Sequence, residues 1–263
     1  MVNIDRYAYA SKLKKTDPML KFVFAMLTLG VCLWANSILI SIIILSIMGW
    51  VAVCKGGTPF LLFVKMLLLP MSFLIISLLT IAINVSNNPE IFLVSLKMSD
   101  FWIGVSKEGL NDAALLFFKV MASVSCLYFL SLTTPMIDLL SVLRKLRVPK
   151  LMVEMMSLIY RFIFILLDTA DTMYTAQSSR LGYSSIKRGY RSLGALASTL
   201  FIRSYKRSND LYTALEARGY DGELNVLEEE FEKSNIKYAG VVLINVIFIL
   251  IALYLRQYSG GLY

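Results

Sequence analysis

Long apolar runs are the feature that most constrains the fold of this chain. Five of them come close to the roughly 20 residues that an α-helix needs to cross the core of a bilayer. They cover residues 19–35, 37–54, 59–85, 110–132 and 239–255. Several such runs are not typical of a soluble domain, so we predict an all-α integral membrane protein with about five transmembrane helices.

The connections between these runs differ in length and polarity. Only Asn36 separates the first run from the second, so we expect the two to form a helical hairpin. Because the second run follows at once, we do not expect the first to be a cleaved signal peptide. The third and fourth runs are joined by a segment with Asn87, Asn88, Pro89 and Asp100, which we interpret as a polar loop. The fourth and fifth are joined by a tract of about a hundred residues, 133–238.

The distribution of lysine and arginine predicts the orientation in the membrane. Of the 26 basic residues, fifteen lie in the tract 133–238 and five lie in the first 21 residues. The loops on the other side hold Lys97 and Lys107, and Arg256 lies near the carboxyl end. The positive-inside rule therefore places the amino terminus and the long tract in the cytoplasm, in a multi-pass protein of the cell membrane. We expect Lys65 and Lys119, which lie inside runs, to have structural roles.

A competing topology makes residues 151–167 a sixth span, because this segment is also rich in apolar residues. That topology would bury Glu154 and Arg161 and would move the basic cluster of residues 180–218 to the outside. We favour a partly apolar helix that lies against the cytoplasmic face or the other spans.

Helical patterns fill the long tract. They predict a short helix over residues 135–146, a long helix from Pro149 toward Gly182, and a second long helix over 186–217 that ends before Gly219. We therefore predict three parts: a membrane domain with spans 1 to 4 (residues 1–132), a cytoplasmic domain of long helices (133–238), and the last transmembrane helix with an outer tail (239–263).

Charge is segregated in the second half of the tract. Eight basic residues lie between 180 and 220, and an acidic run follows: Asp221, Glu223, Glu228, Glu229, Glu230 and Glu232. One interpretation is that the basic residues lie near anionic lipid headgroups and that the acidic run is a solvated turn. The other is that two helix ends each present an arginine to an acidic groove of a partner protein, since a guanidinium fork suits carboxylates.

Two local sequences fit the second interpretation. They are AQSSRLGY, residues 176–183, and ALEARGY, residues 214–220. In each, an arginine comes shortly before a glycine at the end of a long helical pattern, beside a tyrosine. An arginine at the carboxyl end of a helix also interacts with the helix dipole, so one occurrence alone indicates little.

The residues that could carry chemistry are few. The chain has no histidine, and Cys32, Cys54 and Cys126 lie far apart within apolar runs. We therefore expect no metal cluster, no disulfide framework and no bound cofactor. A phosphate-binding Walker motif is also absent from the sequence. These observations predict that the chain has no site for ATP or a transition metal. We also expect a non-catalytic protein and no nucleic-acid partner.

Four stretches along the chain carry a family resemblance: IDRYAYASKLKKTDPMLK, LTTPMIDLLSVLRKLRVP, LIYRFIFILLDTADTMYTAQSSRLGY and RSNDLYTALEARGYDGEL. In this order they resemble the transmembrane T component of energy-coupling factor (ECF) transporters, and more closely the cobalt-type CbiQ family. The second coupling motif of the family, Ala-Arg-Gly, corresponds to Ala217, Arg218 and Gly219. The first corresponds to Ser179, Arg180, Leu181 and Gly182, which departs from Ala-Arg-Gly but keeps the arginine.

The resemblance implies crossed cytoplasmic coupling helices whose two arginine motifs dock on two ABC-type ATPases. It also implies a separate membrane S component that captures the substrate, with cobalt as the expected substrate and nickel or a vitamin as alternatives. Membrane lipids complete the expected partners. Other classes of function are a lipid-modifying membrane enzyme, which would need clustered acidic metal ligands, and a channel or carrier, which would need a polar track across the spans.

Overall fold

A computed structural model of the chain describes residues 4–86, 92–98, 101–220, 231 and 235–258. Most of the described residues are in helices, which confirms the predicted all-α fold class. The chain divides into two compact units. Unit 1 comprises residues 1–139 and 230–263, and unit 2 comprises residues 140–229.

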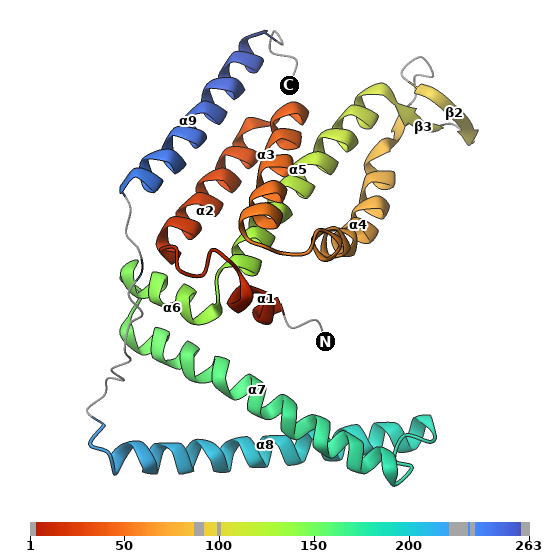
Figure 1. The fold of residues 1–263 in the computed structure, drawn as a ribbon. Helices are drawn as coiled ribbons and strands as arrows, with labels where there is room; N and C mark the ends of the chain where they lie inside the picture. The colour runs from red at the N-terminus through yellow and green to blue at the C-terminus, as the bar shows by residue number, and fades with distance from the viewer. Residues whose placement is uncertain (1–3, 87–91, 99–100, 221–230, 232–234, 259–263) are drawn as a thin grey trace. The chain divides into compact units, whose positions relative to one another are not determined.

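Five helices of unit 1 are long and apolar enough to cross a membrane, as predicted. They are α2 (Pro18–Ala35), α3 (Ile38–Trp50) extended by the π-helix η1 (Val51–Lys55), α4 (Phe60–Ala82), α5 (Lys107–Thr133) and α9 (Asn235–Tyr258). A short helix, α1 (Ile4–Ala10), precedes them. Figure 1 shows α5 in the middle of this bundle, where it packs against α1, α2, α3 and α4, while α9 packs against α2.

The ends of the spans follow from local sequence. Asp17 caps α2 by accepting a hydrogen bond from the Met19 amide (3.0 Å), and Pro18 occupies the first turn, where its missing N–H costs nothing. Asn36 ends α2 with a left-handed φ of 42°. Because α3 begins at Ile38, the predicted hairpin between the first two spans is confirmed.

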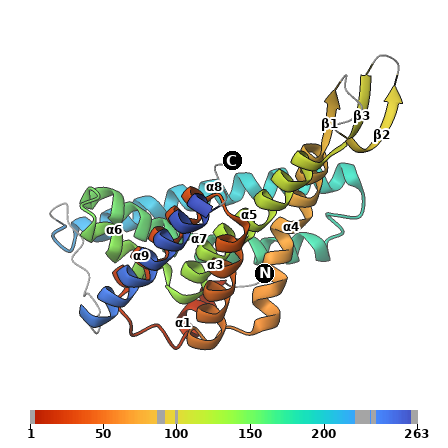
Figure 2. The same cartoon turned by 90° about the horizontal axis from the view of Figure 1, so that it is seen from above.

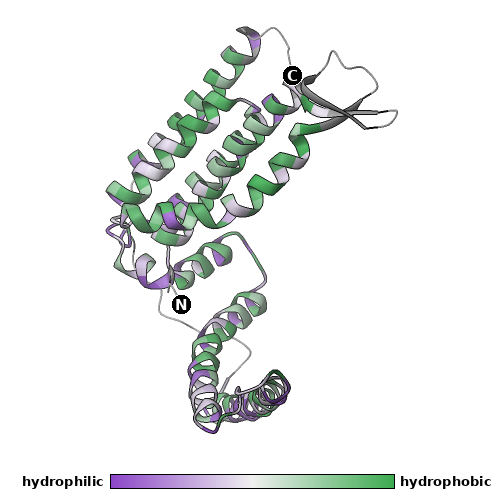
Figure 3. Ribbon diagram, turned by 90° about the vertical axis from the view of Figure 1, so that its right-hand side faces the viewer, coloured by the Kyte–Doolittle hydropathy of each residue, from purple (hydrophilic) through white to green (hydrophobic). Residues whose placement is uncertain are grey.

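The bundle is held by apolar packing and a few buried polar contacts. Phe24 of α2 and Phe129 of α5 meet edge to face, with ring centroids 5.6 Å apart. Thr28 donates a hydrogen bond to Asn245 Oδ1 (3.2 Å), which ties α2 to α9 inside the apolar layer. Such interhelical bonds contribute about 0.6 kcal/mol each. Figure 3 shows hydrophobic residues over much of the bundle helices, as expected of helices that also face lipid.

Between α4 and α5 the chain forms a small antiparallel sheet of order β1-β3-β2, where we had expected a polar loop. The strands are β1 (Ile83–Ser86), β2 (Phe92–Met98) and β3 (Phe101–Ser106), with Ile83 opposite Val105 and Met98 opposite Phe101 (Figure 2). Aromatic and β-branched residues favour strands here. The third span, α4, therefore ends at Ala82, three residues before its predicted end. Asn87, Asn88, Pro89 and Asp100 lie outside the described residues.

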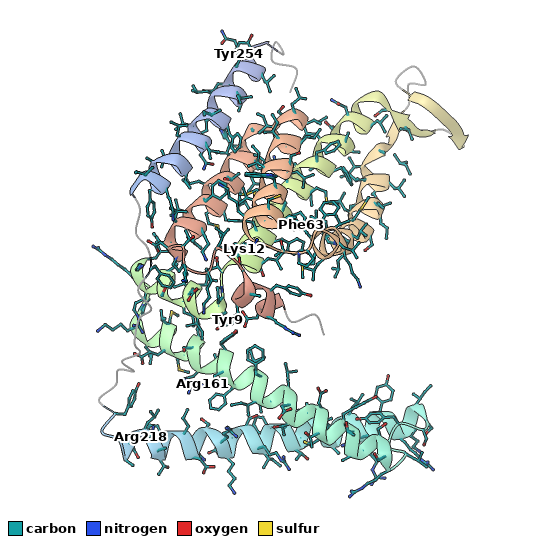
Figure 4. All side chains as sticks on the ribbon, viewed as in Figure 1. Tyr9, Lys12, Phe63, Arg161, Arg218 and Tyr254 are labelled. Carbon is teal, nitrogen blue, oxygen red and sulfur yellow. The ribbon has the colours of Figure 1, made fainter. Side chains whose placement is uncertain are left out.

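The remaining helices are α6 (Met136–Lys145), α7 (Lys150–Ser179) and α8 (Ile186–Glu216). Their bounds agree closely with the predicted helices of the long tract. The chain passes from unit 1 to unit 2 within α6. Among the described helices, α7 is not one of those apolar enough to cross a membrane. Arg161, labelled on α7 in Figure 4, is exposed, and Glu154 is buried.

Candidate functional site

The two predicted arginine motifs lie at the carboxyl ends of α7 and α8, within unit 2. Arg180 is the residue that caps α7, and Arg218 follows Ala217, the residue that caps α8. Both arginines are exposed. Because α8 begins six residues after Arg180 and ends just before Arg218, the two lie at opposite ends of this helix. At 1.5 Å per residue, the 31 residues of α8 span about 46 Å.

The turn at Arg180 is built from three backbone hydrogen bonds. The amide of Arg180 donates to Gln177 O (3.2 Å), that of Leu181 to Ser178 O (3.0 Å), and that of Gly182 to Gln177 O (2.9 Å). The last of these spans six residues, as in a Schellman helix end. Leu181 takes the left-handed position with φ of 59°.

The turn at Arg218 repeats the same pattern. The amide of Arg218 donates to Leu215 O, that of Gly219 to Glu216 O, and that of Tyr220 to Leu215 O, each at 3.0 Å. Gly219 takes the left-handed position with φ of 74°. The two arginines therefore occupy equivalent places in two equivalent turns.

This equivalence explains the departure of the first motif from Ala-Arg-Gly. In the second turn a glycine follows the arginine and adopts the left-handed conformation, which glycine does at no steric cost. In the first turn Leu181 adopts it instead, at a cost of about 1 to 2 kcal/mol. Gly182, one residue later, has a different purpose: a Cβ there would lie 2.8 Å from both Gln177 O and Ser192 Oγ. Glycine is needed at 182 because α8 passes close by.

Side chains from both helices hold the first turn. Gln177 Nε2 donates to Ser192 O (3.2 Å), and the Tyr183 hydroxyl donates to Gln177 Oε1 (2.7 Å). Ser192 Oγ in turn donates to Gly182 O (2.9 Å). The rings of Tyr174 and Tyr183 lie 4.7 Å apart. Gln177, Gly182, Tyr183 and Ser192 are called the latch below.

The second turn has different surroundings. Among the described residues, nothing lies within 4 Å of a Cβ built at Gly219. The Tyr220 hydroxyl donates a long hydrogen bond to Glu154 Oε2 (3.4 Å), near the start of α7. Tyr212 hydrogen-bonds Glu216, and this bond together with the charge of Glu216 raises the pKa of the Tyr212 phenol. Figure 4 shows Arg218 at the end of α8.

Basic side chains lie just after the first turn. Lys187, Arg188 and Arg191 follow the first turn and are exposed, and Arg188 Nη1 donates to Ser184 Oγ (3.0 Å). The acidic run predicted after the second turn lies outside the described residues, except for the position of Phe231 within it. Within the described part of the chain, no three Asp, Glu, Cys or His side chains gather as metal ligands would.

Some residues with structural roles were singled out by the sequence and others were not. Gln177 and Ser192 are ordinary polar residues whose pairing depends on how α8 returns along α7. Lys119, for which we expected a structural role, donates to Asn36 Oδ1 (2.5 Å) in the turn between α2 and α3. Lys21, one of the five basic residues among the first 21, is buried within the bundle.

Comparison with known proteins identifies relatives along the whole chain. Residues 10–228 match the family described as cobalt transport protein, CbiQ. The chain is 35% identical to an uncharacterized protein of Methanocaldococcus jannaschii, over 97% of this chain and 93% of that protein. It is 28% identical to the cobalt transport protein CbiQ of Salmonella typhimurium, over 86% of this chain and 100% of that one. It is also 28% identical to the energy-coupling factor transporter transmembrane protein EcfT of Exiguobacterium sibiricum, over 94% and 95% of the two chains.

Proposed function

Because the chain belongs to the CbiQ family of cobalt transport proteins and is a multi-pass transmembrane component of such a transporter, we propose that it couples ATPase motion to substrate uptake. In this proposal, Arg180 and Arg218 each dock on one of two ABC-type ATPases. Closure of the ATPases on ATP moves the ends of α7 and α8, and the bundle passes this motion to a membrane S component that captures the substrate.

The observation that carries the proposal is the pair of equivalent turns. Two exposed arginines in turns with the same three backbone bonds, at the two ends of one helix, suit two partners that are alike. A guanidinium presents a planar fork that binds carboxylates in two-point contact, which a lysine ammonium does not. Ser179 and Ala217 precede the arginines and Gly219 follows the second one, so small side chains leave the forks accessible.

We also assign a role to each of the two parts of the chain. We propose that residues 1–132 and 239–263 form the membrane domain and that residues 133–238 form the cytoplasmic coupling domain. The compact units, with boundaries at 139/140 and 229/230, support this division. Catalysis would belong to the ATPases, because the chain carries no phosphate-binding motif.

Orientation and substrate are part of the same proposal. The excess of Lys and Arg before α2 and in the tract 133–238 supports a cytoplasmic amino terminus in the cell membrane. Cobalt is the proposed substrate, since the matching family and the Salmonella relative are named for cobalt transport. Nickel or a vitamin is the alternative, because the relatives also include transporter components whose names specify no metal.

Charge reversal of the two arginines tests the coupling role. The ATPases are co-purified with tagged variants of this chain, after its membrane level has been checked by immunoblot. We expect Arg180→Glu and Arg218→Glu to weaken ATPase binding far more than Arg→Lys, since truncating one member of a buried charge pair already costs about 2 to 5 kcal/mol. The double reversal should abolish both the complex and uptake of ⁵⁷Co²⁺.

The matched control is Lys187→Glu, a charge reversal at an exposed position seven residues after Arg180. We expect it to retain assembly. Equal weakening by all three reversals would mean that positive charge acts as a diffuse field and that the arginines are not docking residues. Uptake of ⁶³Ni²⁺ or a vitamin in place of ⁵⁷Co²⁺ by the unmodified transporter would reassign the substrate and leave the coupling role intact.

A further inference from the structure

Lys21 is a buried lysine at the start of the first membrane-spanning helix. Its side chain is 2% exposed, although an ammonium group is costly to bury in an apolar layer. Its Nζ donates to Thr133 O (2.9 Å), at the last residue of α5, and to Leu13 O (3.3 Å), between α1 and α2. One cation therefore links three segments of the bundle through backbone carbonyls.

Two carboxylates add to this arrangement. Asp138, in the first turn of α6, and Asp17, the cap of α2, both interact electrostatically with the Lys21 ammonium. Both are buried. Asp17 Oδ2 also accepts a hydrogen bond from the Tyr238 hydroxyl of α9 (2.8 Å). We call Lys21, Asp17, Asp138 and Tyr238 the Lys21 node.

The node lies where the chain leaves the bundle. α5 ends at Thr133 and α6 begins at Met136, and the two residues between them, Thr134 and Pro135, are buried. α6 then carries the chain from unit 1 into unit 2. Within the described residues, α6 is the covalent connection between the two units. A displacement transmitted along α6 can therefore move the bundle only if the first turn of α6 is held in place against the bundle.

We propose that Lys21 is a positioning residue that fixes the start of α6 to the bundle, so that motion of the coupling helices moves the bundle and does not merely pivot α6 about its link to α5. This inference rests on the proposed function. The physical basis is that hydrogen bonds are directional and apolar contacts are not. Apolar contacts permit sliding, whereas the hydrogen bonds to the Thr133 and Leu13 carbonyls define one position of the Lys21 ammonium. Buried ionic groups often serve such specificity at little net gain in stability.

The first test uses hydrogen exchange on the purified chain and needs no partner. Lys21→Met keeps a chain of similar length and removes the three donors, while Asp138→Asn removes the charge on the α6 side. We expect both to accelerate exchange of the amides at the start of α6, including Leu139, whose N–H donates to Pro135 O. Amides of α4 should be unchanged. The matched control is Lys65→Met, a lysine within α4 that is exposed.

Unchanged exchange in α6 of both variants would overturn the proposal. Acceleration throughout the bundle would also overturn it, because Lys21 would then be a general stability residue. Both outcomes are independent of the ATPases, so they differ from failure of the arginine experiment.

The second test measures coupling in proteoliposomes that hold the complete transporter. ATP hydrolysis and ⁵⁷Co²⁺ uptake are recorded in the same vesicles. We expect Lys21→Met to leave ATPase binding and hydrolysis in place but to lower uptake per ATP by about tenfold, within the range of ordinary coupling free energies. Lys65→Met should keep the normal ratio. A normal ratio in Lys21→Met, or a loss of hydrolysis and uptake in equal measure, would contradict a positioning role.

Discussion

The turns at Arg180 and Arg218 use the same backbone hydrogen bonds, yet different contacts hold them. At Arg180, the latch joins the end of α7 to α8 through two side-chain bonds to and from Ser192. At Arg218, no described atom lies within 4 Å of where a Cβ on Gly219 would stand, and a long bond joins Tyr220 to Glu154. Different residues thus support the same backbone geometry in the two turns, so we expect the two turns to respond to different substitutions.

Gly182→Ala should have the largest effect and should act on the first turn alone. The new Cβ would lie 2.8 Å from Gln177 O, a backbone atom, and from Ser192 Oγ. Overpacking of this kind costs about 1 to 3 kcal/mol, or roughly 5- to 150-fold in the population of open turn. The measurement is the rate of trypsin cleavage after Arg180, normalised to the denatured chain, with cleavage after Arg218 as internal reference.

Gly194→Ala, within α8, is the matched control, because no described atom outside the nearby α8 backbone lies within 4 Å of a Cβ there. It should leave both cleavage rates unchanged or slow them, since alanine favours a helix over glycine. Equal acceleration after Arg180 and Arg218 in Gly182→Ala would mean that the two turns open together and that the latch is not local.

Gly219→Ala should have an intermediate effect and should act on the second turn alone. No described atom lies within 4 Å of the new Cβ, but φ of 74° is unfavourable for alanine by about 1 to 2 kcal/mol. Cleavage after Arg218 should rise by roughly 5- to 30-fold. Leu181→Gly is the reciprocal change, since it gives the first turn the glycine that the second has, and it should slow cleavage after Arg180. Acceleration by Leu181→Gly would show that the leucine side chain stabilises its turn more than its φ of 59° costs.

Removal of the two tyrosine hydroxyls should have the smallest effects. Tyr183→Phe loses the 2.7 Å bond to Gln177, and Tyr220→Phe loses the 3.4 Å bond to Glu154. A hydrogen bond contributes about 0.5 to 1.5 kcal/mol net, and the longer bond belongs at the lower end. We expect Tyr183→Phe to loosen its turn more than Tyr220→Phe loosens the other, in the same cleavage assay. The reverse order would mean that Glu154, not the latch, is the stronger support.

Much of the fold could be predicted because its signals are local. The bounds of α8 differ from the predicted 186–217 by one residue, since Ser185 and Gly219 mark its ends. The hairpin at Asn36 and the five spans follow from apolar runs and their spacing. The roles of the coupling arginines stay predictions, although their turns are now described.

The features that sequence reasoning missed depend on contacts between distant segments. Lys21 bonds Thr133 across 112 positions. Its place inside the first apolar run sets it apart from Lys14 and Lys15, but the sequence does not show which distant residue it contacts. The sheet between α4 and α5 requires that β3 pair with two strands at once. In the sequence, Leu181 is a departure from the Ala-Arg-Gly motif. Its equivalence to Gly219 appears only when the hydrogen bonds of the two turns are compared.

The 31-residue length of α8 limits which insertions and deletions this helix can accept during evolution. A helix advances 1.5 Å and rotates about 100° with each residue. One inserted residue in α8 would therefore barely alter the distance between the two turns but would swing one arginine about 100° around the axis relative to the other. Seven inserted residues would nearly restore the direction and add about 10 Å. An insertion or deletion in α8 thus changes both the distance and the angle between the two arginines. If the arginines dock on two ATPases as proposed, few combinations of distance and angle would fit both partners.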